Sequence, residues 1–285
     1  MYAITGITGQ VGGAVARSLL AANQPVRAVL RDAAKAAAWS ERGCEVALAD
    51  IDDEAALTAA FTGAEAVFVL IPSMFDPSPG FPEARAVHAV LRAALATAGP
   101  GRVLCLSTIG AQAAQENLLS QHGLMERTLG DLSMPICFLR PGWFIENAAW
   151  DVAPARENGV IQSFLQPLDK PVPMVATADI GRVAAGLLQD GWSGRRVVEL
   201  EGPDRVTPNQ IAAGFAHILG RPIRAEPVPR ETWEALFRSQ GMQNPLPRAR
   251  MLDGFNQDWI AFEGKPLKGA VGLETVLREL VARAG

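Results

Sequence analysis

Three glycines near the start of the chain have the spacing of a diphosphate-binding turn. Gly6, Gly9 and Gly12 form a G-x-x-G-x-x-G pattern directly after the apolar run Tyr2 to Thr5. In such a turn the main chain approaches a diphosphate without an intervening Cβ, and N–H groups at the start of the next helix donate to its oxygens. The alternative is an ordinary strand-to-helix turn with spare glycines. Because strand, turn and helix follow in the required order, we favour a dinucleotide site.

Two basic residues stand where many dinucleotide-binding domains have a carboxylate. About 20 residues after the glycines, an NAD site usually has Asp or Glu for the ribose 2′-hydroxyl. This chain has Arg31 there, followed by Lys35. A guanidinium gives a 2′-phosphate planar, charge-assisted hydrogen bonds, whereas a carboxylate repels it. The pattern favours NADP(H) over NAD(H), with one alternative open: Arg31 and Lys35 are solvated surface charges and Asp32 binds the ribose.

The elements that position these residues follow from the hydrophobic pattern. Short apolar runs alternate with helical stretches in the first half, which is typical of βαβ units. The expected strands cover residues 2–5, 26–30, 45–49, 66–71, 102–106 and 136–139. This rhythm predicts an α/β fold, a doubly wound parallel sheet of the Rossmann type, with a second, smaller mixed lobe.

The alternation of short apolar runs with helical stretches ends after Pro141, where prolines mark an irregular stretch. We expect residues 1–153 to form the dinucleotide-binding domain, rejoined by about 172–200, and residues 154–285 to form a smaller C-terminal lobe that covers the substrate. Asp179 is expected to cap a helix over residues 180–188. Thr207 and Pro208 are expected to begin another helix that ends at Gly220.

Composition narrows the class of partner. The chain has 285 residues, with 26 basic against 30 acidic residues and a net charge of −4. This balance, without runs of like charge, predicts no nucleic-acid partner, and the absence of a long apolar run or signal peptide predicts no membrane association. Three scattered cysteines and three scattered histidines predict neither disulfides nor a metal site. We therefore expect a cytoplasmic protein with a small-molecule partner, and leave homodimer formation open.

Five segments together resemble the NmrA-like family, a group of atypical short-chain dehydrogenases and reductases. That family includes NADPH-dependent quinone and azo-dye reductases and cofactor-sensing regulators. The resemblance covers nearly the whole chain. The segments are T-G-I-T-G-Q-V-G at 5–12, V-R-A-V-L-R-D at 26–32, L-R-P-G-W-F-I-E-N at 139–147, A-D-I-G-R at 178–182, and the stretch 201–223.

The resemblance implies a cofactor site along the carboxyl ends of the strands. The residues implied to bind the cofactor are, from the pyrophosphate outwards, Gly6, Thr8, Gly9, Gln10, Val11 and Gly12, then Arg31 and Lys35 at the 2′-phosphate and Asp50 and Ile51 at the adenine. Ile71 and Pro72 would lie against the adenosine ribose and pyrophosphate, and Ser107 and Thr108 would face the nicotinamide. The loop from Pro141 to Asn147 would border the nicotinamide and the substrate.

The chain lacks the acid that short-chain dehydrogenases commonly use to reduce simple carbonyls. That acid is a tyrosine with a lysine four residues later, but Tyr2 is the only tyrosine here. The helix expected to carry the pair has His122 and Glu126 at that spacing. His122 is the candidate catalytic residue, able to polarise a carbonyl, although a structural role is equally compatible with its position.

A quinone suits such a site, because solvent can protonate the hydroquinone anion that hydride transfer leaves. Apolar side chains available to hold a flat acceptor are Met74, Phe75, Phe81, Trp143, Phe144 and Trp150, beside Asn147. Each aromatic could instead be ordinary core.

Two functions therefore remain. The favoured one is an oxidoreductase that transfers hydride from NADPH to a quinone or similar flat electron acceptor, without flavin or metal. The other is a non-catalytic NADP(H) sensor that acts through a protein partner, which the missing tyrosine and lysine permit. An epimerase or isomerase acting on nucleotide sugars is a weaker third, because it too normally needs the tyrosine.

Overall fold

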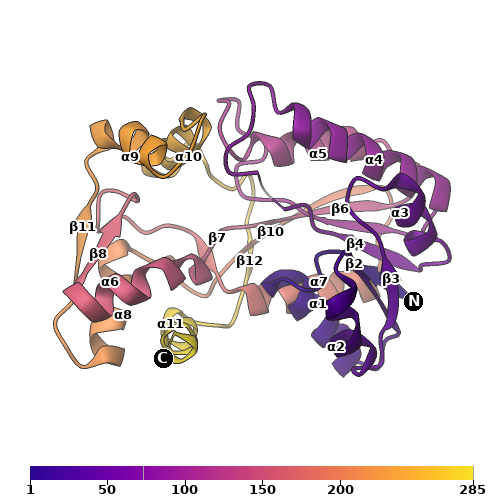
Figure 1. Ribbon diagram of the computed structural model, residues 1–285, viewed down its shortest axis with the longest axis horizontal. Coiled ribbons are helices and arrows are strands. Elements are labelled where there is room, and N and C mark those ends of the chain that lie inside the picture. The colour runs from indigo at the N-terminus through magenta and orange to yellow at the C-terminus, as the bar shows by residue number, and fades with distance from the viewer. Residues whose placement is uncertain (73, 285) are drawn as a thin grey trace.

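The first strands are apolar on both faces, which places them inside a sheet covered on both sides. In strand β4 (Ala66–Val69), Phe68 joins the hydrophobic cluster on one face, while Val67 and Val69 join the cluster on the other. Such double burial is typical of parallel sheets with helices on both faces. The computed structural model, which describes residues 1–72 and 74–284, shows this arrangement (Figure 1).

Eight strands form the large sheet, and every neighbouring pair in it is parallel. Their order is β12-β10-β6-β5-β4-β1-β2-β3. The strands besides β4 are β1 (Tyr2–Ile4), β2 (Val26–Leu30), β3 (Glu45–Leu48), β5 (Val103–Leu106), β6 (Ile136–Pro141), β10 (Arg195–Glu201) and β12 (Leu267–Lys268). The predicted doubly wound α/β fold is confirmed, and all six expected strands are present.

Helices cover both faces of this sheet (Figure 1). On one face lie α1 (Gln10–Ala21), α2 (Ala36–Ser40) and α7 (Thr177–Asp190), and on the other α3 (Glu54–Phe61), α4 (Pro82–Ala98) and α5 (Ser120–Leu129). A short 3-10 helix, η1 (Ala33–Lys35), precedes α2. Across residues 1–72 and 74–284, no helix has the length and apolar character needed to cross a bilayer.

A second, smaller lobe has its own hydrophobic core, centred on Phe215, Trp233 and Phe237. Its elements are β7 (Trp143–Phe144), η2 (Ile145–Asp151), α6 (Val152–Asn158), β8 (Val160–Ser163), β9 (Met174–Val175), α8 (Pro208–Leu219), β11 (Arg224–Pro227), η3 (Arg230–Thr232), α9 (Trp233–Ser239), α10 (Leu246–Asn256) and α11 (Leu273–Arg283). The chain enters this lobe more than once, because β10 and β12 return to the large sheet (Figure 1).

One expected helix start is confirmed and another is wrong. Thr207 accepts from Gln210 N–H at 3.0 Å in a capping box, and α8 ends at Gly220, whose φ is +65°. Asp179 does not cap α7, which begins two residues earlier at Thr177. Instead the Glu146 carboxylate accepts from Thr177 N–H at 2.8 Å. A remote acceptor of this kind cannot be read from local sequence, because it depends on how β7 and η2 pass the helix.

Buried Asp179 holds the C-terminal segment, residues 257–272 between α10 and α11, against α7. Its side chain is 0% exposed, and it accepts from the N–H groups of Ala270 and Val271 at 2.8 Å each and from Arg182 at 2.8 Å. Burial raises the pKa of this carboxyl, but the three hydrogen bonds outweigh burial and lower the pKa overall. Asp179 therefore acts as an internal tie rather than as a cap.

Candidate cofactor and substrate site

The site begins where the strand order reverses, between β1 and β4. Thr5, which follows β1, fastens the two strand ends together. Its hydroxyl accepts from Leu70 N–H at 2.8 Å and donates to the Phe68 carbonyl at 3.2 Å. In open α/β sheets the crevice at such a reversal is the place where ligands bind.

The glycine turn that follows has no room for side chains at two of its positions. Gly6 has a φ of +61°, and a Cβ on Gly12 would lie 2.3 Å from the Gly6 carbonyl oxygen. Helix α1 begins at Gln10 after Gly9, a residue with no side chain to accept from the first-turn N–H groups. Those N–H groups and the positive end of the helix dipole suit a diphosphate. This cradle fits the pyrophosphate of a dinucleotide.

A cavity of about 590 Å³ extends from this turn across the strand ends. We call it the central cavity. Of the residues predicted from sequence, those lining it are Gly6, Thr8, Gly9, Gln10, Val11, Ile71, Pro72, Phe75, Ser107, Thr108, His122, Trp143, Phe144 and Asn147. The ends of β1, β4 and β5 and the segment that follows β6 thus line one cavity. Leu118, Leu119, Thr177, Met251 and Phe255 also line it.

A second cavity, of about 230 Å³, adjoins the central one through Ile71, Pro72 and His122. We call it the Arg31 cavity. Arg31, Ile51 and Met74 line it, so Met74 lies on the side of Arg31 and does not line the central cavity with Ser107 and Thr108.

Four predicted binding residues line neither cavity. Gly12 lies beneath the Gly6 carbonyl, and Pro141 is buried at the end of β6. Lys35 is exposed at the end of η1, and the Asp50 carboxylate accepts from Ile51 N–H at 2.7 Å. Asp32, the alternative ribose ligand, caps η1 by accepting from Ala34 N–H at 3.0 Å. Arg31 lines the Arg31 cavity, and Asp32 does not.

A third cavity, of about 310 Å³, adjoins the central cavity on its other side. We call it the distal cavity. It shares Phe75, Trp143, Phe144, Asn147 and Met251 with the central cavity, and its own lining includes Trp150, Asp151 and Arg248. The three cavities therefore adjoin in series, with the central one in the middle.

The aromatic candidates for a substrate slot separate into two groups. One group lines the central or distal cavity and consists of Phe75, Trp143, Phe144 and Trp150. Trp150 lines the distal cavity alone and is 86% exposed. Phe81 packs with Ala84 and Leu124 in a small hydrophobic cluster. Its role is that of a core residue.

His122 lines the central and Arg31 cavities as an uncharged imidazole. Burial lowers its pKa to about 4, and the nearby Glu126 carboxylate opposes this only in part. Within the described part of the chain its Nδ1 atom is buried without a hydrogen-bond partner. A neutral imidazole can donate one hydrogen bond to a ligand, but it is not an imidazolium that protonates one at neutral pH.

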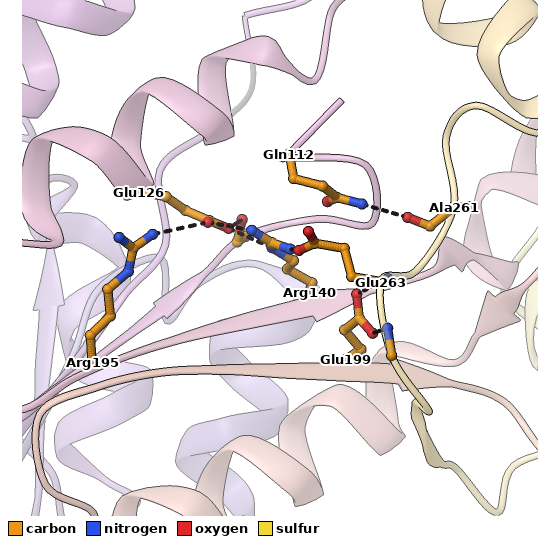
Figure 2. A network of polar contacts seen from close by, with 9 residues as sticks. Gln112, Glu126, Arg140, Arg195, Glu199, Ala261 and Glu263 are labelled. Atoms are coloured by element: carbon orange, nitrogen blue, oxygen red, sulfur yellow. Dashed lines mark hydrogen bonds and ion pairs between the residues drawn. The ribbon is translucent and has the colours of Figure 1, made fainter. Parts of the chain in front are cut away.

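Ser107, beside the central cavity, is held by the buried ion pair of Glu126 and Arg140. Its hydroxyl donates to Glu126 Oε1 at 2.6 Å, and Arg140 donates to both Glu126 oxygens at 2.8 and 2.7 Å. Figure 2 shows Arg140 between Glu126 and Glu263, which comes from the C-terminal segment. Burial lowers the pKa of the Arg140 guanidinium, but these carboxylates outweigh burial and raise it overall. The Ser107 proton is committed inward, so its oxygen can only accept from a ligand.

Asp151, in the distal cavity, has no charged partner among residues 1–72 and 74–284. Burial raises the pKa of its carboxyl to about 7. It therefore holds its proton in weakly acidic solution and loses it as the pH rises past neutrality.

No metal centre accompanies these residues in the part of the chain that the structure describes. It contains no group of three or more histidine, cysteine, aspartate or glutamate side chains able to hold a metal ion.

Comparison with known proteins places the chain in a family. Residues 2–256 match the NmrA-like family. The protein belongs to that family. The NAD(P)H azoreductase of Xenophilus azovorans is 28% identical over 251 residues, 87% of this chain and 84% of the relative. Quinone oxidoreductase 2 of Escherichia coli is 31% identical over 249 residues, 86% and 84% of the two chains.

Solved structures agree with the NmrA-like assignment. An NADPH-dependent quinone oxidoreductase from Escherichia coli, crystallised with NADPH, superposes with a TM-score of 0.81 at 27% identity, covering 100% of this chain and 99% of the other. The triphenylmethane reductase of Citrobacter sp. reaches a TM-score of 0.78 at 20% identity, covering 98% and 99%. At that lower identity the likeness shows the fold alone.

Several residues of this NmrA-like protein's site escaped the sequence reasoning. Arg140 carried a signal, because a charge directly after the apolar run 136–139 predicts a partner, but nothing local identified that partner as Glu126. Nothing in the sequence around Met251 and Phe255 indicated that they belong to the site. They are apolar residues of α10 and reach the cavity only through the packing of the second lobe.

Glu126→Gln should destabilise the protein by about 3 to 5 kcal/mol, because it leaves the Arg140 guanidinium buried without its main counter-charge. Glu263→Gln removes the other carboxylate, which is 60% exposed, and should cost less than about 1 kcal/mol. Urea unfolding of both variants and the wild type measures the difference. Similar small losses for the two variants would contradict a dominant Glu126–Arg140 pair.

Asp151→Asn should stabilise the protein more at pH 8 than at pH 5. The folded-state pKa of about 7 is above the unfolded value near 3.8, so the folded state holds the proton longer and stability falls as the pH rises between them. The gain from the substitution should therefore increase by about 2 to 3 kcal/mol between pH 5 and pH 8. Urea unfolding at both pH values tests this, with exposed Asp169→Asn as the control. A gain independent of pH would show that Asp151 is not protonated by burial.

Proposed function

We propose that this chain is an oxidoreductase that transfers hydride from NADPH to a quinone or similar flat electron acceptor. The observation that carries the proposal is the series of adjoining cavities. The Arg31 cavity adjoins the central cavity, whose lining includes both the glycine turn and the region of Ser107 and Trp143, so the two cavities together could take the adenosine, diphosphate and nicotinamide of one dinucleotide.

The residues present fit NADPH. The first turn of α1 and the glycines would hold the diphosphate, Arg31 the 2′-phosphate, and Ile51 and Ile71 the adenosine. When bound, NADPH supplies a hydride from its nicotinamide ring. Ser107 and Thr108, at the end of β5, would border that ring and could orient its polar groups.

The acceptor side of the cavity positions a ring but offers no committed acid. Trp143, Phe144 and Phe255 give it apolar walls. His122 is neutral, and the Ser107 proton is held by Glu126. An acceptor whose reduced form is a stabilised anion needs no protein acid, because solvent can protonate it afterwards. Quinones satisfy this requirement.

The comparisons support this reading. The relatives at 28% and 31% identity are an NAD(P)H azoreductase and a quinone oxidoreductase, so their acceptors are small molecules. The structural neighbour at 27% identity was solved with NADPH. Preference for NADPH over NADH in this chain rests on Arg31.

Purified protein should oxidise NADPH when benzoquinones or naphthoquinones are added, because the central cavity can hold a flat ring against the nicotinamide. Loss of absorbance at the reduced-nicotinamide band measures turnover. Binding of NADPH without turnover on any quinone would instead favour the cofactor-sensing alternative. No binding of any nicotinamide dinucleotide would overturn both.

Arg31→Asp should weaken NADPH binding by about one to two decades and largely spare NADH, because only NADPH has the 2′-phosphate that the guanidinium would bind. Isothermal titration with each cofactor gives the two dissociation constants. Exposed Arg42→Asp makes the same change of charge away from the three cavities and serves as the control. Equal losses for both cofactors would refute the assignment of Arg31.

A further inference from the structure

The distal cavity is not needed by the dinucleotide. With NADPH bound as proposed, the cofactor occupies the Arg31 cavity and the part of the central cavity along the glycine turn. The distal cavity contains no residue of that turn and joins the central one through Trp143, Phe144 and Asn147. It therefore lies on the side from which an acceptor would meet the nicotinamide.

Arg248, on α10, brings a partly buried cation to this cavity without a carboxylate to balance it. Its guanidinium lies 4.3 Å from the centre of the Phe237 ring, and Nη1 contacts Met242 Sδ at 3.9 Å. Burial lowers its pKa. Nearby Arg230 differs, since Asp253 accepts from it at 2.6 and 2.8 Å.

Removing a charge from water is costly, so a partly buried charge such as Arg248 favours an opposite charge nearby. Throughout residues 1–72 and 74–284, no carboxylate forms an ion pair with Arg248. The balancing charge that the site lacks is an anion, and the planar guanidinium fork matches a sulfonate or a carboxylate.

The remaining walls of the distal cavity suit an aromatic ring. Phe75, Trp143, Phe164 and Met251 line it. Asp151 is its other ionisable lining residue, and this carboxyl keeps its proton in weakly acidic solution because burial raises its pKa to about 7. Below that pH, Arg248 is the charged residue in the lining of the cavity.

We propose that the distal cavity binds an anionic substituent of the electron acceptor, a sulfonate or carboxylate on a flat aromatic ring, through Arg248. The proposal rests on the proposed function, because it assumes that the acceptor's ring is reduced in the central cavity. Arg248 is then a residue that determines specificity. It acts on acceptors with an anionic group and has no part in reducing neutral ones.

The test compares 1,4-naphthoquinone with 1,4-naphthoquinone-2-sulfonate at about pH 6, where Asp151 is mostly protonated. Arg248→Met should raise the KM for the sulfonate about 10-fold or more, with kcat and the neutral quinone changed less than about twofold. Arg248→Lys keeps the charge and should recover part of the loss. Arg250→Met removes an exposed charge two residues along α10 and should change neither KM.

A binding measurement separates this proposal from the proposed function. Titration of the sulfonated quinone into protein saturated with NADP⁺ needs no turnover, and Arg248→Met should weaken that binding by the same factor. Equal losses for both quinones, or no loss for the sulfonate, would overturn the role of Arg248. If the wild type reduces neither quinone but binds the sulfonated one through Arg248, the proposed function fails while the anion subsite stands.

Discussion

The buried pair of Glu126 and Arg140 is the interaction on which the site depends. It joins α5 to β6, holds the Ser107 hydroxyl at the end of β5, and reaches Glu263 in the C-terminal segment. Charges this deeply buried are tolerated only when their hydrogen bonds are nearly complete. Each oxygen of Glu126 accepts from Arg140, so the geometry around Ser107 is fixed by electrostatics as well as by packing.

The C-terminal segment is fastened to the dinucleotide-binding part by several polar ties of the same kind. Asp179 accepts from two of its N–H groups, and Glu199 accepts from those of Glu263 and Gly264 at 2.8 Å each (Figure 2). In each of these hydrogen bonds a main-chain N–H donates to a carboxylate, either buried Asp179 on α7 or Glu199 on β10. They fix the residues between α10 and α11 to β10 and α7, while Met251 and Phe255 of α10 line the central cavity.

The sequence predicted the parts of this molecule that are encoded locally. The alternation of apolar runs predicted all six expected strands, because a buried strand needs apolar side chains. The glycine spacing predicted the turn, because the backbone there leaves no space for a Cβ. Capping of α8 followed from Thr207 and Pro208. The prediction that Asp179 caps a helix was wrong. Its residue type and position fit a cap, but its main-chain partners lie 91 and 92 residues away. The pairing of Arg140 and the place of Arg248 likewise depend on tertiary packing, which one sequence does not show.

Burial also decides what chemistry the site can perform. It lowers the pKa of His122 so that the imidazole is neutral, and the paired Glu126 carboxylate accepts the hydrogen bond that the Ser107 hydroxyl donates. Neither of these two side chains in the lining of the central cavity is therefore an acid at neutral pH. What the protein provides is apolar walls and a cation at either end of the cavity series, Arg31 and Arg248. Such a site distinguishes acceptors by shape and charge, and it leaves the protonation of the product to solvent.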